Sequence, residues 1–483
     1  MAKSLFYVSA ALGGAYNGGS SATVKLTAAD EFTVDGGSTT TITHNSGTPW
    51  TGCSVGDWLC FDEVEWRRIT VIDGDDATVH AACTPANGVS CTVGGPLSTL
   101  DAMLDIANAD GPTDFTDADG DAPQILCRDL GSEADLSLST NFLASQPIEI
   151  VGCGSDWTPY SRWGTDRVVL TGSPTGNYVL YIDAAYVRVV GLDIEATGSS
   201  KRGLGASGNA HYLQVQGCRL AGTHSAFSPY SSLYLLFENN LVEDSPYGIY
   251  NFWAPYYAHV RNNVFRDMTT AVFHGSRAGN VIENNLIYDC TDVAVYATTL
   301  RFYFRHNTVA DCTGDVFSLA GETELGATTI VNNIVENIGG GMVASTLASG
   351  NYYFGEWANN GINGVTDPDD KTYIHYDTST DVAGEMFVET TPATRVTNGD
   401  YRIAAAARGA GFPAAMPDGG ATVASTDLGA AQAVVVVPIV SHVLTDDADY
   451  GYYSELAGEA TAGGSGGACV IGSSVIVPDQ GGL

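Results

Sequence analysis

A short pattern recurs about every 22 residues in the middle of the chain and constrains the fold more than any other feature. Each copy has a few alternating apolar residues, two polar residues usually ending in Asn, two apolar residues, and an acid or amide. The residues after the polar pair are spaced by 21, 23, 22, 22 and 26: Leu220, Leu241, Val264, Leu286, Thr308 and Ile334. This period, with apolar alternation and no helical periodicity, predicts a β-solenoid with one coil per period.

Stacked coils place like residues above one another at roughly 4.8 Å. The second polar position then predicts a ladder of amides that hydrogen-bond between coils at a bend, where Asn also tolerates the left-handed conformation. Its members are Asn240, Asn263, Asn285, Asn307 and Asn333. One position before the polar pair, the charge alternates in sign, as expected for neighbours across a strand spacing. That row is Glu238, Arg261, Glu283 and Arg305.

Two further rows accompany the ladder. Cys290 and Cys312 fall where other coils have apolar residues, so we expect them to stack as small buried thiols. The other row carries like charges: Asp244, Asp267, Asp289 and Asp311. Neighbouring carboxylates at this spacing repel by roughly 1 kcal/mol in water. Each Asp either caps its own turn, or the row holds a cation, or a pair serves as acid and base as in glycoside hydrolysis.

Upstream, strand-like segments with turn glycines continue the pattern less regularly at 147–154, 167–170 and 187–194. Ahead of them, apolar residues at helical spacing from Leu97 to Ala109, with Ser98 and Asp101 at capping-box spacing, predict a short amphipathic helix. A helix at this place would plug the open end of the apolar bore, which is the cap that a solenoid needs.

The Asn-bearing repeat resembles a right-handed parallel β-helix of the pectate-lyase-like superfamily, over residues 95 to about 430. The closing segments 399–411 and 427–431 are similar to the ends of many bacterial and phage proteins of this kind. The resemblance implies an all-β solenoid. Because the superfamily includes lyases, hydrolases, esterases, adhesins and viral spikes, function must be argued from the sites.

We expect four parts in the chain. An edge strand of the solenoid occupies 1–19, and short alternating strands between Gly, Asp and Ser turns predict a small antiparallel β-barrel or sandwich over 20–94. The parallel β-helix occupies 95–430. In 431–483, apolar strands joined by glycine-rich linkers need a surface with which to pair, so we expect a C-terminal assembly or attachment segment.

Four cysteines lie in the 20–94 module and could pair, bind zinc or stay free: Cys53, Cys60, Cys83 and Cys91. Their spacings lack the tight Cys-x2-4-Cys knuckle of a zinc site, so disulfides or free thiols are favoured over zinc.

The formal net charge of −35 argues against nucleic acid or an anionic membrane as a partner. The apolar run 433–440 is far shorter than the roughly 18 residues of a membrane span and contains Pro438. The apolar stretch within the first eight residues is too short for an export signal. We therefore expect a chain that is made without export or has lost its leader.

The sequence offers few candidate catalytic residues. Lys occurs only at positions 3, 25, 201 and 371, and no segment matches the hydrolase motifs of the superfamily. Weak catalytic candidates on the coil face are Asp267, Asp289 and Arg266. We expect no cofactor, with calcium at the alternating acids as the one candidate. Those acids are Asp117, Asp119 and Asp121, and Arg128 stands where an EF-hand loop needs Glu.

Aromatic residues outside the alternating strands suit stacking on sugar rings or on a neighbouring subunit: Trp253, Tyr256 and Tyr257. The favoured hypothesis is a non-catalytic structural protein of a virus particle, such as a phage spike, fibre or head decoration, that binds other virion proteins, self-associates as a homotrimer and contacts surface glycans. The alternatives are a polysaccharide lyase or glycoside hydrolase, and a secreted bacterial surface protein or adhesin.

Overall fold

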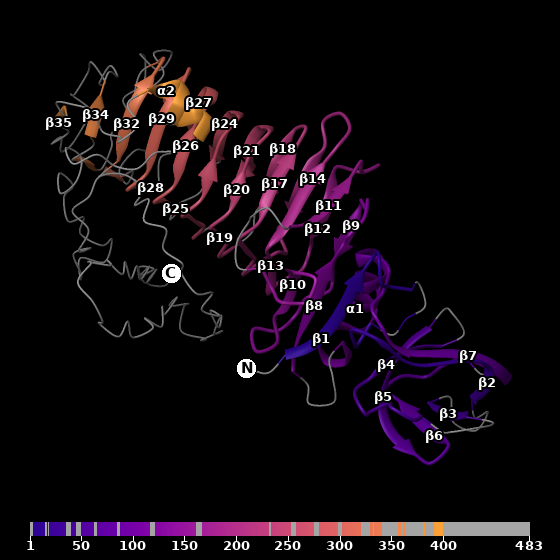
Figure 1. Cartoon of the computed structure of the whole chain (residues 1–483). Coiled ribbons are helices and arrows are strands. Elements are labelled where there is room, and N and C mark those ends of the chain that lie inside the picture. The colour runs from indigo at the N-terminus through magenta and orange to yellow at the C-terminus, as the bar shows by residue number, and fades with distance from the viewer. Residues whose placement is uncertain are drawn as a thin grey trace, which may run out of the picture. The chain divides into compact units, whose positions relative to one another are not determined.

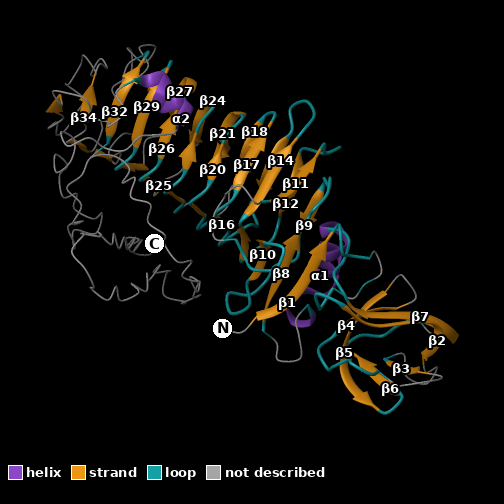
Figure 2. Ribbon diagram, viewed as in Figure 1, coloured by secondary structure: helices purple, strands orange, loops and turns teal. Residues whose placement is uncertain are grey.

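The architecture is that of a computed structural model in which strands dominate (Figures 1 and 2). The chain forms two compact units, Met1–Leu220 and Ala221–Leu483. The structure describes residues 3–14, 17, 19–34, 40–44, 50–61, 65–84, 87–115, 121–160, 167–230, 233–252, 257–274, 280–297, 302–319, 329–331, 333–340, 356–358, 361–363, 380–381 and 391–398. The expected assembly segment 431–483 and the closing segments 399–411 and 427–431 lie outside these ranges.

In the first unit, three stacks of parallel strands form the coils of a β-helix. The first stack is β1 (Lys3–Ser9), β8 (Ala122–Arg128), β10 (Ile148–Gly152), β13 (Val187–Val190) and β16 (Gln214–Gln216). The second is β11 (Val168–Gly172), β14 (Leu192–Ala196) and β17 (Arg219–Gly222). The third is β9 (Leu136–Leu138), β12 (Tyr178–Ile182) and β15 (Arg202–Ala206). The predicted N-terminal edge strand is β1, which pairs in parallel with β8.

The second unit repeats the arrangement of three parallel stacks. Its first stack is β19 (Leu236–Glu238), β22 (His259–Arg261), β25 (Asn280–Glu283), β28 (Phe302–Arg305), β31 (Thr329–Val331) and β33 (Glu356–Ala358). The second is β20 (Leu241–Val242), β23 (Val264–Phe265), β26 (Leu286–Tyr288), β29 (Thr308–Cys312), β32 (Ile334–Ile338), β34 (Gly361–Asn363) and β35 (Thr380–Asp381). The third is β18 (Ser225–Pro229), β21 (Ser245–Phe252), β24 (Met268–His274), β27 (Cys290–Ala297) and β30 (Asp315–Leu319), and a helix, α2, spans Pro392–Asn398.

The predicted amide ladder is confirmed. The Oδ1 of Asn285 accepts hydrogen bonds from the main-chain N–H and the side-chain amide of Asn263, both at 2.9 Å. Its Nδ2 donates to the carbonyl of Val260 at 2.9 Å and to Oδ1 of Asn307 at 3.0 Å. The same pattern joins Asn240 to Asn263 and Asn307 to Asn333. Amides are therefore buried at the bend without being left unsatisfied.

The left-handed residue of each bend precedes the stacked Asn. These residues are Asn239 (φ 57°), Asn262 (φ 58°), Asn284 (φ 53°) and His306 (φ 54°). The expectation that the stacked Asn itself takes this conformation is therefore wrong. The stacked Asn must point its side chain into the interior, so the left-handed conformation that makes the bend falls on the residue before it.

The predicted end cap is α1 (Leu100–Asp114), which buries Leu100, Met103, Leu104 and Ala107. Its N-cap is Thr99 rather than Ser98: the Thr99 hydroxyl accepts from the N–H of Ala102 at 3.3 Å. The Glu133 carboxylate, from outside the helix, accepts from the N–H groups of Leu100 (3.1 Å) and Asp101 (3.0 Å). A residue distant in sequence therefore satisfies N–H groups of the first helical turn.

The antiparallel module is a closed barrel. Its strands are β2 (Val24–Val34), β3 (Thr41–His44), β4 (Trp58–Phe61), β5 (Glu65–Asp73), β6 (Asp76–Val79) and β7 (Asn87–Gly94). An aromatic cluster joins the barrel to the β-helix cap within the first unit: Phe6 stacks on Phe115 with ring centroids 4.1 Å apart, and both contact Trp58. No helix in the described part of the chain is long and apolar enough to cross a membrane.

Candidate functional site

A row of left-handed residues connects the second strand stack to the third in the second unit. Its members are Asp244 (φ 52°), Asp267 (φ 54°), Asp289 (φ 54°), Asp311 (φ 53°) and Asn337 (φ 55°). Asp and Asn tolerate this conformation better than other non-glycine residues. The bend therefore accounts for the type of residue at these positions.

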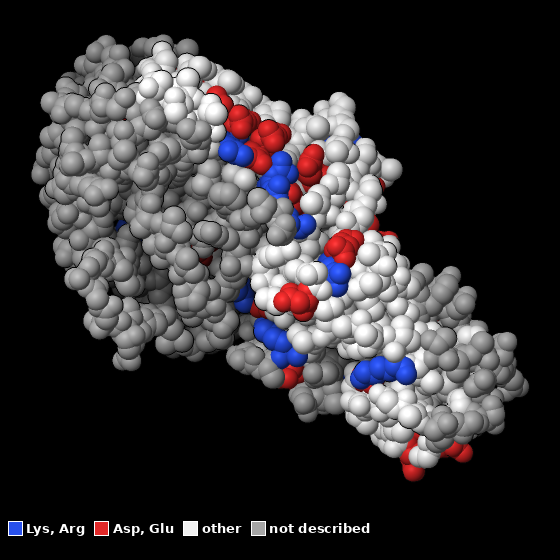
Figure 3. Space-filling model, in the orientation of Figure 1, with Lys and Arg blue, Asp and Glu red and all other residues white. Residues whose placement is uncertain are grey.

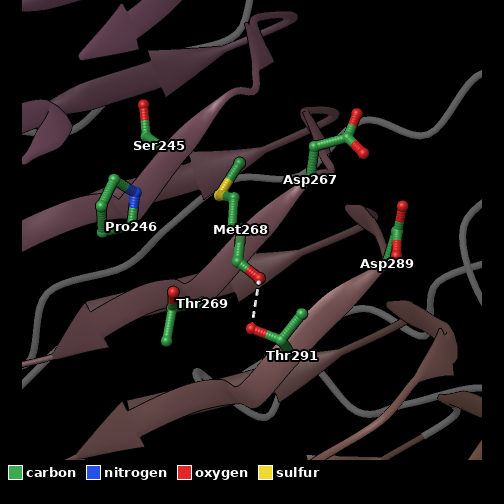
Figure 4. Close-up of a pocket in the computed structure, with 7 residues that line it drawn as sticks. All are labelled: Ser245, Pro246, Asp267, Met268, Thr269, Asp289 and Thr291. Carbon is green, nitrogen blue, oxygen red and sulfur yellow. Dashed lines mark hydrogen bonds between the residues drawn. The ribbon is translucent and has the colours of Figure 1, made fainter. Parts of the chain in front are cut away.

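Two members of the row, Asp267 and Asp289, line a hollow of about 370 Å³. Figure 4 shows both carboxylates projecting to the same side of the coils. The hydroxyl of Thr291 donates to the carbonyl of Met268 at 3.4 Å and links two coils along its wall. The hollow is also lined by Ser245, Pro246 and Thr269. Two of the three predicted catalytic candidates are thus brought together in one depression.

The two carboxyl groups are electrostatically coupled. Burial, a hydrogen bond with Asp289 and the charge of Asp289 raise the pKa of Asp267, while the guanidinium of Arg266 opposes the shift. Arg266 lies 3.8 Å from the Asp267 carboxylate. A pair that holds one proton between two carboxyls can act as acid and base in principle.

The third catalytic candidate, Arg266, is directed mainly toward other groups. Its Nε donates to Glu243 at 2.6 Å, and its Nη1 donates to the hydroxyl of Tyr288 at 3.3 Å. Glu243 and Tyr288 are both buried. The guanidinium therefore serves chiefly as a bridge over the outer surface of three successive coils.

Paired charges continue on the outer side of the first strand stack. In the second unit Arg261 lies 3.1 Å from Glu238, and Glu283 lies 2.6 Å from both Arg305 and His259. These contacts agree with the alternating signs predicted for the row. Glu283 is buried, yet its pKa is lowered well below the ordinary value, because the attraction of His259 and Arg305 outweighs the cost of burial. Figure 3 shows acidic and basic side chains gathered side by side on the visible face.

Only one predicted sugar-stacking residue, Tyr257, lies within the described ranges, since Trp253 and Tyr256 fall outside them. Tyr257 is left-handed (φ 59°) and stacks on Tyr234 (φ 57°), with ring centroids 5.3 Å apart and planes 16° apart. The first unit has an equivalent pair, Tyr186 and Tyr212, at 4.7 Å and 5°. Sequence reasoning missed these pairs, although a tyrosine one or two residues before β13, β16, β19 and β22 is a signal that could have revealed them.

Among the predicted calcium ligands, Asp117 and Asp119 lie outside the described residues, and the carbonyl of Asp121 accepts from the Ser4 hydroxyl at 2.7 Å. Within the described ranges, no group of three or more His, Cys, Asp or Glu side chains is arranged to hold a metal ion. The four barrel cysteines are free thiols. Burial raises the pKa of Cys53 and of Cys83 to about 11, which disfavours the thiolate that zinc requires.

Comparison with known proteins agrees with this architecture. Residues 195–356 match the family model described as the right handed beta helix region, and a search of curated proteins finds no match. Among solved structures, the chain is similar to an alginate lyase from Paenibacillus sp. str. FPU-7, at 17% identity over 58% of this chain and 97% of that chain, with a TM-score of 0.37.

Two further structures show the range of proteins with this likeness. Pectate lyase Pel9A is 14% identical over 70% of this chain and 91% of its own, with a TM-score of 0.43. ORF18 of Geobacillus virus E2 is 10% identical over 56% of this chain and 59% of its own, with a TM-score of 0.36. At these identities and scores nothing about activity or partners follows. The stacked coils show that the described part of the chain forms a parallel β-helix, and residues 195–356 match the right handed beta helix region.

Proposed function

We propose that the chain is a non-catalytic structural protein of a virus particle, a spike, fibre or decoration in which the β-helix is a stiff shaft. The barrel, joined to the cap by the Phe6, Trp58 and Phe115 cluster, is then a terminal module held firmly on that shaft. Self-association as a homotrimer, contacts with other virion proteins and contacts with surface glycans belong to the same proposal.

The observation that carries the proposal is that the scaffold itself uses the candidate catalytic groups. Asp267 and Asp289 occupy the same left-handed bend as three other members of their row, and Asn337 replaces the carboxylate by an amide at one of them. Arg266 is held by Glu243 and Tyr288. A catalytic centre needs particular groups at one point of a solenoid, whereas the aspartates recur from coil to coil.

Two measurements on the full chain test this function. Sedimentation velocity is expected to show a trimer, and mass spectrometry of purified virus particles is expected to detect the chain as a stoichiometric component. A monomer that releases reducing ends or unsaturated uronates from a glycan panel, and that is absent from particles, contradicts the proposal.

Glycan contact is supported by the stacked, left-handed Tyr234 and Tyr257 at a corner of the second unit. Aromatic rings at a solenoid corner present apolar surface to sugar rings. Tyr257→Asn keeps a residue that tolerates the bend but removes the ring, so we expect weaker retention on a glycan array. Tyr212→Asn in the first unit is the matched control. Equal retention of both variants and the parent chain argues against a glycan role for Tyr257.

The second candidate function is a polysaccharide-degrading enzyme, favoured by the raised pKa of Asp267 beside Asp289 in a surface hollow. In that case Asp289→Asn abolishes glycan cleavage while leaving the fold intact, because Asn tolerates the same backbone conformation. The structural proposal expects no cleavage in the parent chain and therefore no change in the variant.

A further inference from the structure

Two cysteines occupy the same position in successive coils of the second unit. Cys290 directly follows the left-handed Asp289, and Cys312 directly follows the left-handed Asp311. The main-chain N–H of Thr313 donates to the carbonyl of Cys290 at 2.9 Å, the bond expected between register neighbours in a parallel pair. The two residues are therefore direct neighbours across one coil spacing.

Their side chains are buried and lie one above the other. Cys290 is 1% exposed and Cys312 is 3% exposed. Each thiol is directed to the carbonyl two residues earlier, Tyr288 at 3.8 Å and Ala310 at 3.4 Å, and those two residues are themselves paired in register. A hydrogen bond with Cys312, followed by burial, raises the pKa of Cys290 well above the ordinary value. The two thiols thus occupy equivalent buried positions in adjacent coils of the solenoid.

We propose that Cys290 and Cys312 form a coil-to-coil disulfide site, oxidised by exchange with a small-molecule disulfide such as oxidised glutathione. Neighbouring strands are about 4.8 Å apart, and disulfides join Cα atoms about 4.4 to 6.8 Å apart. The bond would close a single coil and tie its start to its end, which makes it a staple along the shaft.

The exchange is balanced in two steps. One cysteine thiolate attacks a glutathione sulfur, forms a mixed disulfide and releases one glutathione thiolate, which takes up the proton that the cysteine lost. The second cysteine attacks the protein sulfur of that mixed disulfide and releases the second glutathione. Two protein thiols are oxidised, and one glutathione disulfide is reduced to two thiols. Because both thiols are buried and out of reach of glutathione, the reaction occurs while the coil forms or opens rather than in the closed fold.

The first unit supplies a matched comparison. Cys127 lies in β8 and Cys153 directly follows β10, the strand paired with β8, but the register partner of Cys127 is Gly152. Successive strand residues face opposite sides, and Cys153 belongs to a cluster with Leu126, Val151 and Val190. Its side chain is therefore on the other face of the sheet from that of Cys127. Both pairs of cysteines are contributed by adjacent coils, but only Cys290 and Cys312 occupy equivalent positions in those coils.

The test is refolding of the full chain in a glutathione redox buffer, followed by alkylation of remaining thiols and peptide mass mapping. We expect a linked peptide containing Cys290 and Cys312, no linked Cys127 and Cys153, and a melting temperature above that of the reduced protein. In Cys312→Ala, Cys290 should be alkylated or carry glutathione, and the melting temperature should not respond to the redox buffer.

Recovery of Cys290 and Cys312 as alkylated thiols, under conditions in which glutathione does modify other cysteines, overturns the proposal. An equal yield of a linked Cys127 and Cys153 peptide also overturns it, because stacking would then have no influence. The peptide map of the parent chain decides the question even if Cys312→Ala does not fold.

Discussion

The two units build the same bend from different side chains. In the second unit, a left-handed Asn precedes a buried Asn whose amide bonds to the coils on both sides. In the first unit, the left-handed residues are Gly191 (φ 64°) and Gly217 (φ 62°), followed by Leu192 and Cys218. The Cys218 thiol contacts the carbonyls of Gln216 at 3.4 Å and Val189 at 3.6 Å.

Those two contacts correspond to the ones that Asn307 makes with the carbonyls of Arg305 (3.0 Å) and Ile282 (2.9 Å). A thiol is a weak donor with one hydrogen, whereas an amide donates two hydrogens and accepts on its oxygen. The Cys218 sulfur also accepts from the N–H groups of Gly191 and Leu192 in the preceding coil, but a thiol accepts more weakly than an amide oxygen. Bends in both units are therefore linked from coil to coil, and the links in the second unit are the stronger ones.

The largest expected effect concerns the buried charges of the second unit. Glu283→Gln removes the carboxylate that both Arg305 and His259 contact at 2.6 Å, and Arg305 is only 4% exposed. Loss of one partner from a buried pair costs about 3 to 5 kcal/mol. Denaturant unfolding measures the change. The control is Glu195→Gln, whose partly exposed pair with Arg219 should change stability by less than about 1 kcal/mol. Equal losses of stability in Glu283→Gln and Glu195→Gln would show that burial does not set the contribution of these ion pairs.

The amide ladder is the next test. Asn285→Ala removes the acceptor for two donors of Asn263 and the donor for the Val260 carbonyl, all within the interior. Unsatisfied buried groups cost about 1 to 3 kcal/mol each before relaxation, so we expect a loss of about 2 to 4 kcal/mol. Cys218→Ala should cost about 1 kcal/mol, chiefly through lost packing. Hydrogen exchange should show deprotection in the coils on both sides of Asn285, and a purely local change would contradict the linked network.

In the aspartate row, a substitution is expected to raise the stability of the fold rather than lower it. The raised pKa of Asp267 means that the folded state binds its proton more tightly than the unfolded chain, whose Asp pKa is about 3.9. The resulting destabilisation is complete above the folded pKa and disappears as the pH falls between these two values. Asp289→Asn removes one repulsive neighbour, so we expect a gain of about 1 kcal/mol at pH 7 and a smaller gain in acid. Denaturant unfolding of the parent chain and of Asp289→Asn, at pH 7 and in acid, measures this difference in stability.

Asp311→Asn is the matched control for this row, because the Asp311 carboxylate accepts from the Asn337 amide at 2.7 Å rather than facing a second carboxylate at that end. We expect no comparable gain from it. A gain equal to that of Asp289→Asn would assign the effect to overall charge instead of the carboxyl pair.

The smallest expected effect tests the bend itself. Asn262→Gly introduces at a left-handed position (φ 58°) the residue that the first unit uses at its own bends. Relief of backbone strain offsets the loss of the side-chain bonds to Glu238 and Asn284. We expect a net change below about 1 kcal/mol in thermal or denaturant unfolding. A large loss would show that these side-chain bonds, and not the backbone conformation, govern the position.

Repetition made the fold of the second unit predictable. The Asn ladder, the alternating charges and the stacked Cys290 and Cys312 were all derivable from spacing, because each coil can bury its interior only against a copy of itself. Asp267 and Asp289 were also predicted as neighbours on that basis. The sequence predicted repulsion along this row but not which carboxyl has a raised pKa, since the pKa of Asp267 depends on burial and on the direction of the Arg266 side chain.

The sequence by itself therefore determined the coil, its period and the residues that stack, because those follow from a repeat along one dimension. Only the tertiary structure decided that Glu133 completes the cap of α1, that the left-handed residue precedes each stacked Asn, and that Arg266 bridges to Glu243 and Tyr288. These outcomes depend on side-chain directions and on contacts between residues far apart in the chain, which a periodic pattern does not encode.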